Sequence, residues 1–212
     1  MFVSDWMTKK VITIAPDSSI SEAVRLIKEK KIKHLPVVKD DKLKGIVSDR
    51  DIKEYSPSKA TTLDIFELNY LLARTKVKEI MRTGVCTTTP DTPVEELAMM
   101  MLDNNIGCCP VLEGGRLVGI ISDKDIFTVL VDITGVRHGG HRISATIEDR
   151  PGSIRELADI IRKHDFNLQG ILTSYEKAPK GFRNVVIRCE GKGKFASLRA
   201  ELTGTYKGVV CT

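Results

Sequence analysis

The sequence predicts an α+β protein that consists of two copies of one small unit followed by a third domain of different pattern. Three observations lead to this class. The stretch GIVSDRDI at Gly45–Ile52 returns as GIISDKDI at Gly119–Ile126. Each copy combines short β-branched stretches with segments of helical spacing. From His141 onward the pattern changes to the order β-α-β-β-α-β. A chain of 212 residues has room for two or three small domains.

The duplication extends well beyond the doubled phrase. A shift of 74 residues, from Gly45 to Gly119, lays Met7–Ile52 on Met81–Ile126 without a gap. The shift superposes the Pro-Asp pairs, the Pro-Val pairs, and the Gly, Ser and two Asp of the doubled phrase. Matches at so many Pro, Gly and Asp positions indicate an internal repeat.

Each copy predicts the same elements in the same order. In the first, a strand at Val11–Ile14 precedes a helix with a Ser N-cap, two strands joined by the turn DDK, and a helix that opens at Ser48. In the second, a helix at Val94–Asn104 precedes strands at Cys109–Leu112 and Leu117–Ser122, joined by the turn EGGR. A unit this small cannot cover both faces of its sheet, so we expect the copies to pack sheet to sheet.

The segments between and after the copies complete the organisation. Residues 56–76 predict a connecting helix, because Ile65, Leu68, Leu71 and Leu72 share one face. Residues 132–140, with Gly139–Gly140, are the expected linker to the third domain.

The third domain, residues 141–212, predicts a ferredoxin-like split unit. A strand in HRISATIED is followed by a helix that places Ile154, Leu157, Ile160 and Ile161 on one face. Strands in FNLQGILTSYE and FRNVVIRCE then form a hairpin across KAPKG, before a helix in KFASLRAELTGT and a last strand in YKGVVC.

Composition restricts the function classes. The net charge of +5 is mild, and the densest basic run, Arg25–His34, contains a Glu and no aromatic residue, which is typical of a solvated helix face.

The five Cys residues form no C-x-x-C pair and favour reduced thiols in the cytoplasm. No stretch approaches about 18 apolar residues, so neither a membrane span nor a signal peptide is expected. Cys108, Cys109 and His34 lack the spacing of a zinc site, and we expect no metal.

The doubled phrase has two readings. Ser-x-x-Asp where a strand meets a helix is a capping box, and on spacing alone the cap is better supported. The same corner also suits a nucleotide, since a helix N-terminus attracts phosphate and an Asp one turn inside can accept hydrogen bonds from both hydroxyls of a ribose.

Three features of each copy resemble the CBS domain. They are the leading Met with its β-branched stretch, the strands IKHLPVV and IGCCPVL, and the closing G-h-h-S-x-x-D. The resemblance implies a tandem CBS pair (a Bateman module) with domains at residues 1–55 and 77–131 and two adenine-nucleotide sites, both usable. Carried over by position, the implied nucleotide-binding residues are Thr13, Ile14, Ile32, His34, Pro36, Ser48, Arg50, Asp51, Thr87, Ile106, Cys108, Pro110, Ser122, Lys124 and Asp125. For Arg50 and Lys124, an exposed charge on the first helical turn is an equal alternative.

The third domain resembles the ACT domain through IEDRPGSI followed by DFNLQGI. The resemblance implies an amino-acid effector held by Asp149, Gly152 and Asn167. Asp149 stands where Asn is common, and an Asp would repel a carboxylate. Amino-acid binding and a purely dimerising role therefore remain equal alternatives.

The whole chain resembles bacterial CBS–ACT acetoin-utilisation accessory proteins. This resemblance implies a cytoplasmic, homodimeric ligand sensor that binds AMP, ADP, ATP or S-adenosylmethionine, requires no cofactor and modulates a partner protein. No catalytic motif is present, so we expect no enzyme. Two alternatives stay open: a structural dimerisation module with vestigial sites, and a nucleic-acid-binding regulator that uses the basic run at Arg25–Lys33.

Overall fold

The computed structural model describes residues 1–55 and 65–212, and the side chains of residues 1–55 and 70–212. The chain divides into two compact units, Met1–Ile126 and Phe127–Thr212, each with its own core. The division falls inside helix α6 (Asp123–Ile133), upstream of residues 132–140, where the sequence places the linker.

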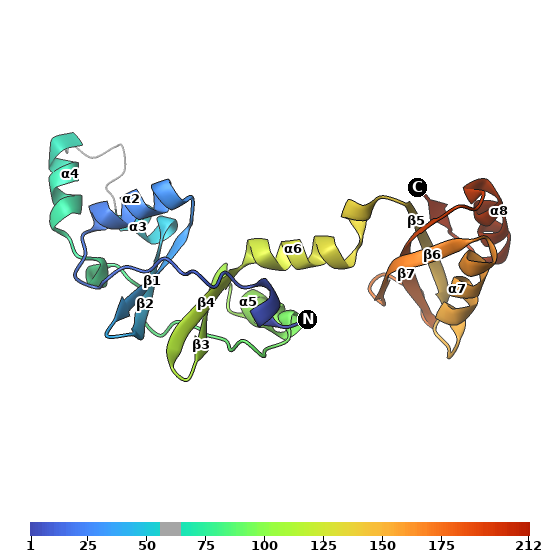
Figure 1. The fold of residues 1–212 in the computed structure, drawn as a ribbon, viewed down its shortest axis with the longest axis horizontal. Coiled ribbons are helices and arrows are strands. Elements are labelled where there is room, and N and C mark those ends of the chain that lie inside the picture. The colour runs from blue at the N-terminus through green and yellow to red at the C-terminus, as the bar shows by residue number, and fades with distance from the viewer. Residues whose placement is uncertain (56–64) are drawn as a thin grey trace. The chain divides into compact units, whose positions relative to one another are not determined.

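The first unit contains both repeats (Figure 1). A short helix α1 (Val3–Trp6) comes first. The first repeat then forms α2 (Ile20–Lys30), β1 (His34–Lys39), β2 (Lys42–Ser48) and α3 (Asp49–Tyr55). The second forms α5 (Val94–Asp103), β3 (Cys108–Glu113), β4 (Arg116–Ser122) and the start of α6. Each hairpin is antiparallel, with equivalent registers (His34↔Ser48 and Cys108↔Ser122) and an irregularity at the same place. The predicted duplication is confirmed.

The leading segments of the two repeats are exchanged. Thr8 of the first repeat pairs with Ile120 in β4, and its equivalent Arg82 pairs with Ile46 in β2. This close approach accounts for the Gly in each copy of the doubled phrase, because a Cβ at Gly119 would collide with the side chain of Met7. A Cβ at Gly45 would likewise lie 2.6 Å from the backbone oxygen of Arg82. Each leading segment therefore packs on the other repeat's hairpin and ties the two repeats together.

The strand expected at Val11–Ile14 does not form, and the expectation is wrong. The segment makes only an isolated parallel bridge between Ile14 and Val37. Just before this segment, Thr8 pairs with Ile120 of the second repeat. The segment therefore connects the two hairpins and adds a full third strand to neither of them.

Each repeat has its own core. In the first, Ile20, Ala23 and Ile27 on α2 pack against Leu35, Val37 and Val47 of the hairpin. In the second, Leu97 and Met101 on α5 pack against Cys109, Val111 and Ile121. The predicted N-cap is also present, since Ser19 Oγ accepts a hydrogen bond of 3.2 Å from the backbone N–H of Glu22. Strands β2 and β4 lie against each other, as the sheet-to-sheet expectation requires.

The predicted connecting helix is observed in part as α4 (Ile65–Arg74), followed by a 3-10 turn, η1 (Val77–Glu79). Helix α4 lies beside α2 (Figure 1). Of its expected apolar face, Leu72 packs against the core of the first repeat and Leu71 is exposed. Residues 56–64 and the side chains of Ile65 and Leu68 lie outside what the structure describes.

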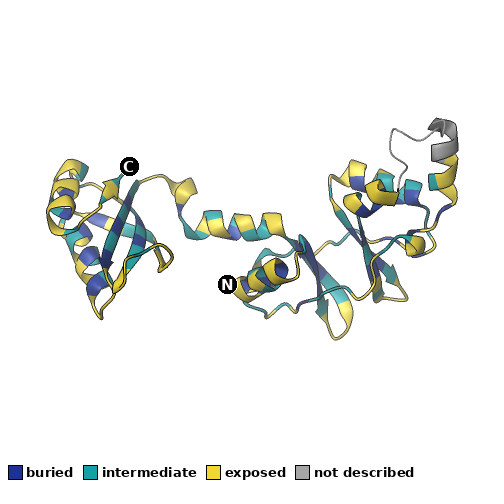
Figure 2. Ribbon diagram, turned by 180° about the vertical axis from the view of Figure 1, so that it is seen from behind, coloured by how far each residue is buried: buried dark blue, intermediate teal, exposed yellow. Residues whose placement is uncertain are grey.

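The second unit confirms the predicted β-α-β-β-α-β order (Figure 1). After a 3-10 turn, η2 (Val136–His138), its elements are β5 (His141–Glu148), α7 (Ser153–Lys163), β6 (Phe166–Ser174), β7 (Phe182–Gly191), α8 (Phe195–Thr205) and β8 (Val210–Cys211). The sheet order is β6-β7-β5-β8 and every pair is antiparallel. Leu157 and Ile161 of α7 and Leu198 and Leu202 of α8 are buried in the core beneath this sheet. Figure 2 shows buried positions on the strands and helices of this unit. The last strand is reduced to Val210–Cys211.

Candidate functional site

Both strand-to-helix corners have the Asp half of the predicted capping box, and in the first corner the backbone N–H of Asp51 also donates to Ser48 Oγ at 3.2 Å. The backbone N–H of Ser48 donates to Oδ2 of Asp51 at 2.8 Å, and that of Ser122 donates to Oδ2 of Asp125 at the same distance. Each Ser hydroxyl donates to the same carboxylate oxygen. The cap uses one oxygen of each Asp, so the state of the other oxygen decides whether the corner can bind a ligand.

In the first corner that second oxygen is occupied. Oδ1 of Asp51 accepts a hydrogen bond of 2.6 Å from Nε of Arg82, and Asp51 is only 8% exposed. Burial alone would raise the pKa of Asp51, but the hydrogen bonds from Ser48 and Arg82 outweigh it and hold the pKa below its usual value. This carboxylate is therefore ionised and fully engaged.

The second corner opens into a cavity of about 400 Å³. Among the hydrogen bonds and ion pairs of the described residues, none reaches Oδ1 of Asp125, and this side chain is half-buried. The cavity combines the leading segment of the first repeat with the corner of the second, because Thr8 pairs with Ile120. Its walls are Thr8, Lys10, Val11, Ile12, Lys31, Ile32, Lys33, His34, Cys108, Ile120, Ile121, Ser122, Asp123, Lys124 and Asp125.

The chemistry of this cavity falls into three parts. Apolar side chains such as Val11, Ile12 and Ile32 can enclose a flat ring. Asp125 offers one carboxylate oxygen to a pair of hydroxyl groups. Four lysines, at positions 10, 31, 33 and 124, supply positive charge for an anionic group.

His34 adds a neutral polar group to the cavity wall. Burial lowers the pKa of His34, although Asp123 and Asp51 act in the opposite direction. A neutral imidazole can donate one hydrogen bond and accept another, which suits the edge of a base.

The sequence-predicted residues divide between this cavity and other places. Six of them line it: Ile32, His34, Cys108, Ser122, Lys124 and Asp125. Ser48 and Asp51 form the first corner, and Arg50 is exposed on α3. Ile14 is buried in the first core, Pro36 and Pro110 are buried within β1 and β3, and Thr87 and Ile106 are half-buried. Ile14, Pro36 and Pro110 are buried and are not among the residues that line this cavity, so their nucleotide-binding role stays a prediction.

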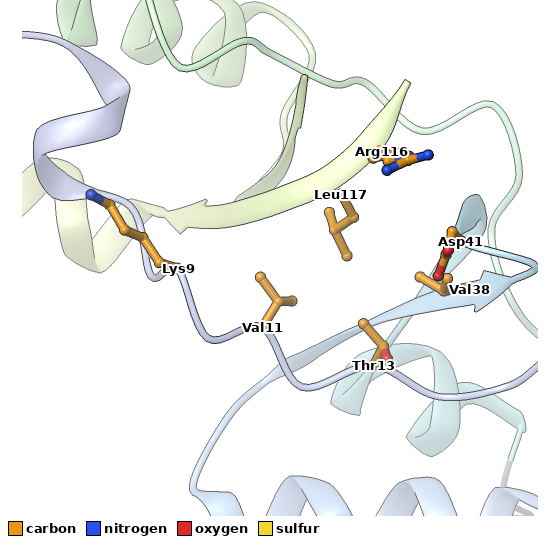
Figure 3. Close-up of a pocket in the computed structure, with 7 residues that line it drawn as sticks. All are labelled: Lys9, Val11, Thr13, Val38, Asp41, Arg116 and Leu117. Carbon is orange, nitrogen blue, oxygen red and sulfur yellow. The ribbon is translucent and has the colours of Figure 1, made fainter. Parts of the chain in front are cut away.

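Thr13 lines a different cavity, also of about 400 Å³, on the side of the hairpin turns (Figure 3). Its other lining residues are Lys9, Val11, Val38, Asp41, Arg116 and Leu117. The charged groups of this cavity do not converge. Figure 3 shows Lys9 at one end and Arg116 and Asp41 at the other.

Sequence reasoning missed the contributions of Thr8, Lys10, Lys31, Lys33 and Arg82. The 74-residue shift aligns Thr8 with Arg82, so the two positions are recognisable as equivalent in the sequence. Nothing in the sequence shows that each leading segment pairs with the hairpin of the other repeat. Lys31 and Lys33 also explain part of the basic run, since they face the cavity.

The Cys108 thiol in the cavity wall gives a direct test of burial. Burial, with Cys109, Asp125 and Asp123 nearby, raises the pKa of Cys108 to about 12. Only about 10⁻⁴ of this thiol is thiolate at pH 8, and the thiolate is the reactive form. We expect iodoacetamide at pH 8 to modify the half-buried Cys86 in the native protein long before Cys108, and both equally in urea. Peptide mass mapping over time measures this order, and equal native rates would contradict the described burial.

The residues predicted for an amino-acid effector are only partly brought together. Asp149 and Gly152 lie between β5 and α7, where Oδ1 of Asp149 is 3.5 Å from Nε of Arg183. Asn167 lies at the opposite end of the sheet, because β5 and β6 both run antiparallel to β7, which places the starts of β5 and β6 at the same end. Within one chain, Asn167 therefore lies away from Asp149 and Gly152, and the amino-acid site stays a prediction.

Neither a metal-binding cluster nor a membrane-spanning helix is present in the part of the chain that the structure describes. Within residues 1–55 and 70–212, no three His, Cys, Asp or Glu side chains gather where they could hold a metal ion. Among the helices that the structure describes, none is long and apolar enough to span a membrane.

Comparison with known proteins identifies the family. The family model for the CBS domain matches residues 3–58 and 77–132, which together make up more than half of the chain. The chain therefore belongs to the CBS-domain family and carries a tandem pair of these domains.

Curated relatives match over this pair. The chain is 36% identical over 126 residues to a homoserine O-acetyltransferase of Methanosalsum zhilinae, a match that covers 58% of the chain and 23% of that enzyme. It is 30% identical over 124 residues to the CBS domain-containing protein YhcV of Bacillus subtilis, covering 58% of the chain and 81% of YhcV. The chain thus spans about a quarter of the acetyltransferase, and the match lies in the region of the CBS pair.

Solved structures match the same region. AcuB of Vibrio cholerae, whose name assigns it to acetoin utilization, is 31% identical with a TM-score of 0.55, covering 65% of this chain and 96% of AcuB. The CBS pair of MJ0100, solved with 5′-methylthioadenosine and S-adenosyl-L-methionine, is 30% identical with a TM-score of 0.51, covering 61% and 95%. CBSX2, solved with AMP, is 28% identical with a TM-score of 0.52, covering 62% and 97%.

Proposed function

We propose that this protein is a non-catalytic regulator that senses an adenine nucleotide through the cavity at its second corner. The observation that carries the proposal is the uncommitted oxygen of Asp125 beside a cavity whose lining combines apolar side chains with four lysines. The adenine-derived ligands solved with MJ0100 and CBSX2 support the choice of adenine. Ser122 and Asp125 would hold the ribose end and the lysines the phosphates, while Ile32, His34 and Cys108 would face the base.

The charge of the cavity separates the candidate ligands. The lining has four lysines against two carboxylates, Asp123 and Asp125, so its net charge is positive, which attracts phosphate and repels a sulfonium cation. We therefore place AMP, ADP and ATP ahead of S-adenosylmethionine.

Thermal melting with AMP, ADP, ATP and S-adenosylmethionine tests this function. We expect at least one phosphate-bearing nucleotide to raise Tm, because a ligand at about 100 times its Kd adds about 2.7 kcal/mol to the free energy of unfolding. Guanosine diphosphate serves as the matched control for the base. If none of the adenine compounds moves Tm, the structural alternative with vestigial sites is favoured.

Homodimerisation belongs to the same proposal. On α5, Met99 and Leu102 are 60% and 81% exposed, whereas the equivalent positions on α2 carry Arg25 and Lys28. An exposed apolar helix face that the first repeat lacks favours pairing of two second repeats. Native mass spectrometry in the nucleotide screen reports the number of subunits.

The C-terminal unit is proposed to be an ACT domain on the basis of its sequence resemblance and its β-α-β-β-α-β fold. An amino-acid effector would meet Asp149 with its ammonium group, and Ser153 and Arg183 with its carboxylate. Nη2 of Arg183 already donates to Ser153 Oγ at 3.1 Å.

The regulated partner is proposed to be a protein in the cytoplasm. The nucleic-acid alternative has less support, because Arg25 pairs with Glu29 and the neighbouring lysines 31 and 33 line the cavity.

A further inference from the structure

The two corners have the same backbone but different neighbours. Thr8 and Arg82 occupy equivalent positions, and each forms a pair of backbone hydrogen bonds with the hairpin of the other repeat. The distances agree closely: 2.9 and 3.1 Å between Thr8 and Ile120, and 2.9 and 3.0 Å between Arg82 and Ile46. The side chain at this position therefore points toward an equivalent place in both corners.

The identity of this side chain changes what its Asp can do. Arg82 donates Nε to Oδ1 of Asp51 at 2.6 Å, while the Asp51 side chain is 7% exposed and that of Arg82 is 64% exposed. A ribose would need that same oxygen, and breaking a charge-assisted hydrogen bond lowers affinity on the order of 10- to 100-fold. Threonine at position 8 is too short to make the equivalent bond to Asp125.

The charges around the two corners differ in the same direction. Lys10, Lys31 and Lys33 at the second corner correspond, after the 74-residue shift, to Gly84, Asn105 and Gly107 at the first. The first corner thus lacks three of the four cations that would hold phosphate. It keeps Arg50 at the position of Lys124, while Arg82 is bound to Asp51.

We infer that Arg82 closes the first corner, so that each chain binds one nucleotide and binds it at the second corner. This inference rests on the proposed nucleotide-sensing function and names the residue that makes the two sites unequal. Arg82 is a specificity-determining residue here, since it blocks the ribose and makes no contact with the bound nucleotide.

Exchange of the two residues between repeats tests the inference. Isothermal titration calorimetry with ADP is carried out on the full chain and on Arg82→Thr, Thr8→Arg and the double exchange. We expect one ADP per chain for the wild type, two for Arg82→Thr with the new site weaker, none for Thr8→Arg, and one weak site for the double exchange. Arg137→Thr, the same kind of substitution at an exposed position of the second unit, is the matched control and should bind one ADP with wild-type affinity.

The outcomes distinguish the inference from the function on which it depends. Two ADP per wild-type chain, or an unchanged stoichiometry in either single exchange, would overturn the role of Arg82 while leaving nucleotide sensing intact. No ADP bound by any of the variants would overturn both. A urea denaturation curve for each variant shows that the protein is folded, and Arg82→Lys, which keeps the charge, should retain one site per chain.

Discussion

Asp125→Ala is expected to weaken ADP binding by about 100-fold or more, whereas Asp51→Ala leaves the affinity within about twofold. Asp125 has the uncommitted carboxylate oxygen of the cavity. Under the proposed function, its replacement removes two charge-assisted hydrogen bonds to the ribose. Asp51 has no such oxygen, because Arg82 and Ser48 occupy its carboxylate. Fluorescence or calorimetric titration measures both affinities.

The pair of variants controls for stability. Both substitutions remove the Asp half of a helix cap, worth on the order of 1 kcal/mol, and Asp51→Ala also removes the hydrogen bond to Arg82, so the variant that is expected to keep its affinity is the more destabilised one. A difference in affinity between them therefore reports on the ligand and not on the fold. Equal losses in the two variants would show that both corners bind, and unchanged affinity in Asp125→Ala would remove this residue from the site.

Leu97→Ala is expected to lower the free energy of unfolding of the first unit by about 2–5 kcal/mol. Leu97 is fully buried on α5 in the core of the second repeat, among Val3, Cys109, Val111 and Ile121. Alanine is the better helix former, so the loss comes from the cavity and not from the helix. Ala23 is the equivalent residue in the first repeat, which shows that the helix backbone tolerates alanine there.

Urea denaturation followed by circular dichroism measures this loss. Glu96→Ala, a truncation at an exposed polar position of the same helix, is the matched control and should change the free energy by no more than about 0.5 kcal/mol. If Leu97→Ala cost no more than Glu96→Ala, the second repeat would not have the described core.

The repeat made most of the first unit predictable. Gly, Pro and Asp at matched positions fix turns and caps locally, and the hairpins and the Ser-x-x-Asp corners follow from them. The β-α-β-β-α-β order of the second unit was readable for a similar reason, since its apolar positions alternate clearly between strand and helix spacing.

The exchange of leading segments was not predictable, and it decides the site. A residue such as Thr8 contacts a hairpin more than a hundred positions away, and no local pattern encodes that pairing. The carboxylates and hydroxyls of both corners could therefore be predicted from the sequence. The contact of Arg82 with Asp51, which makes the two corners different, could not. The distant placement of Asn167 was missed for the same reason, because it depends on the direction of β6 in the assembled sheet.

A crystal structure of the protein grown with ADP tests the central claim most directly. We predict a nucleotide in the cavity beside β4 and α6, with its ribose hydroxyls on Asp125, its phosphates among the lysines, and Arg82 still paired with Asp51. An empty second corner, or a nucleotide whose ribose lies on Asp51, would contradict it.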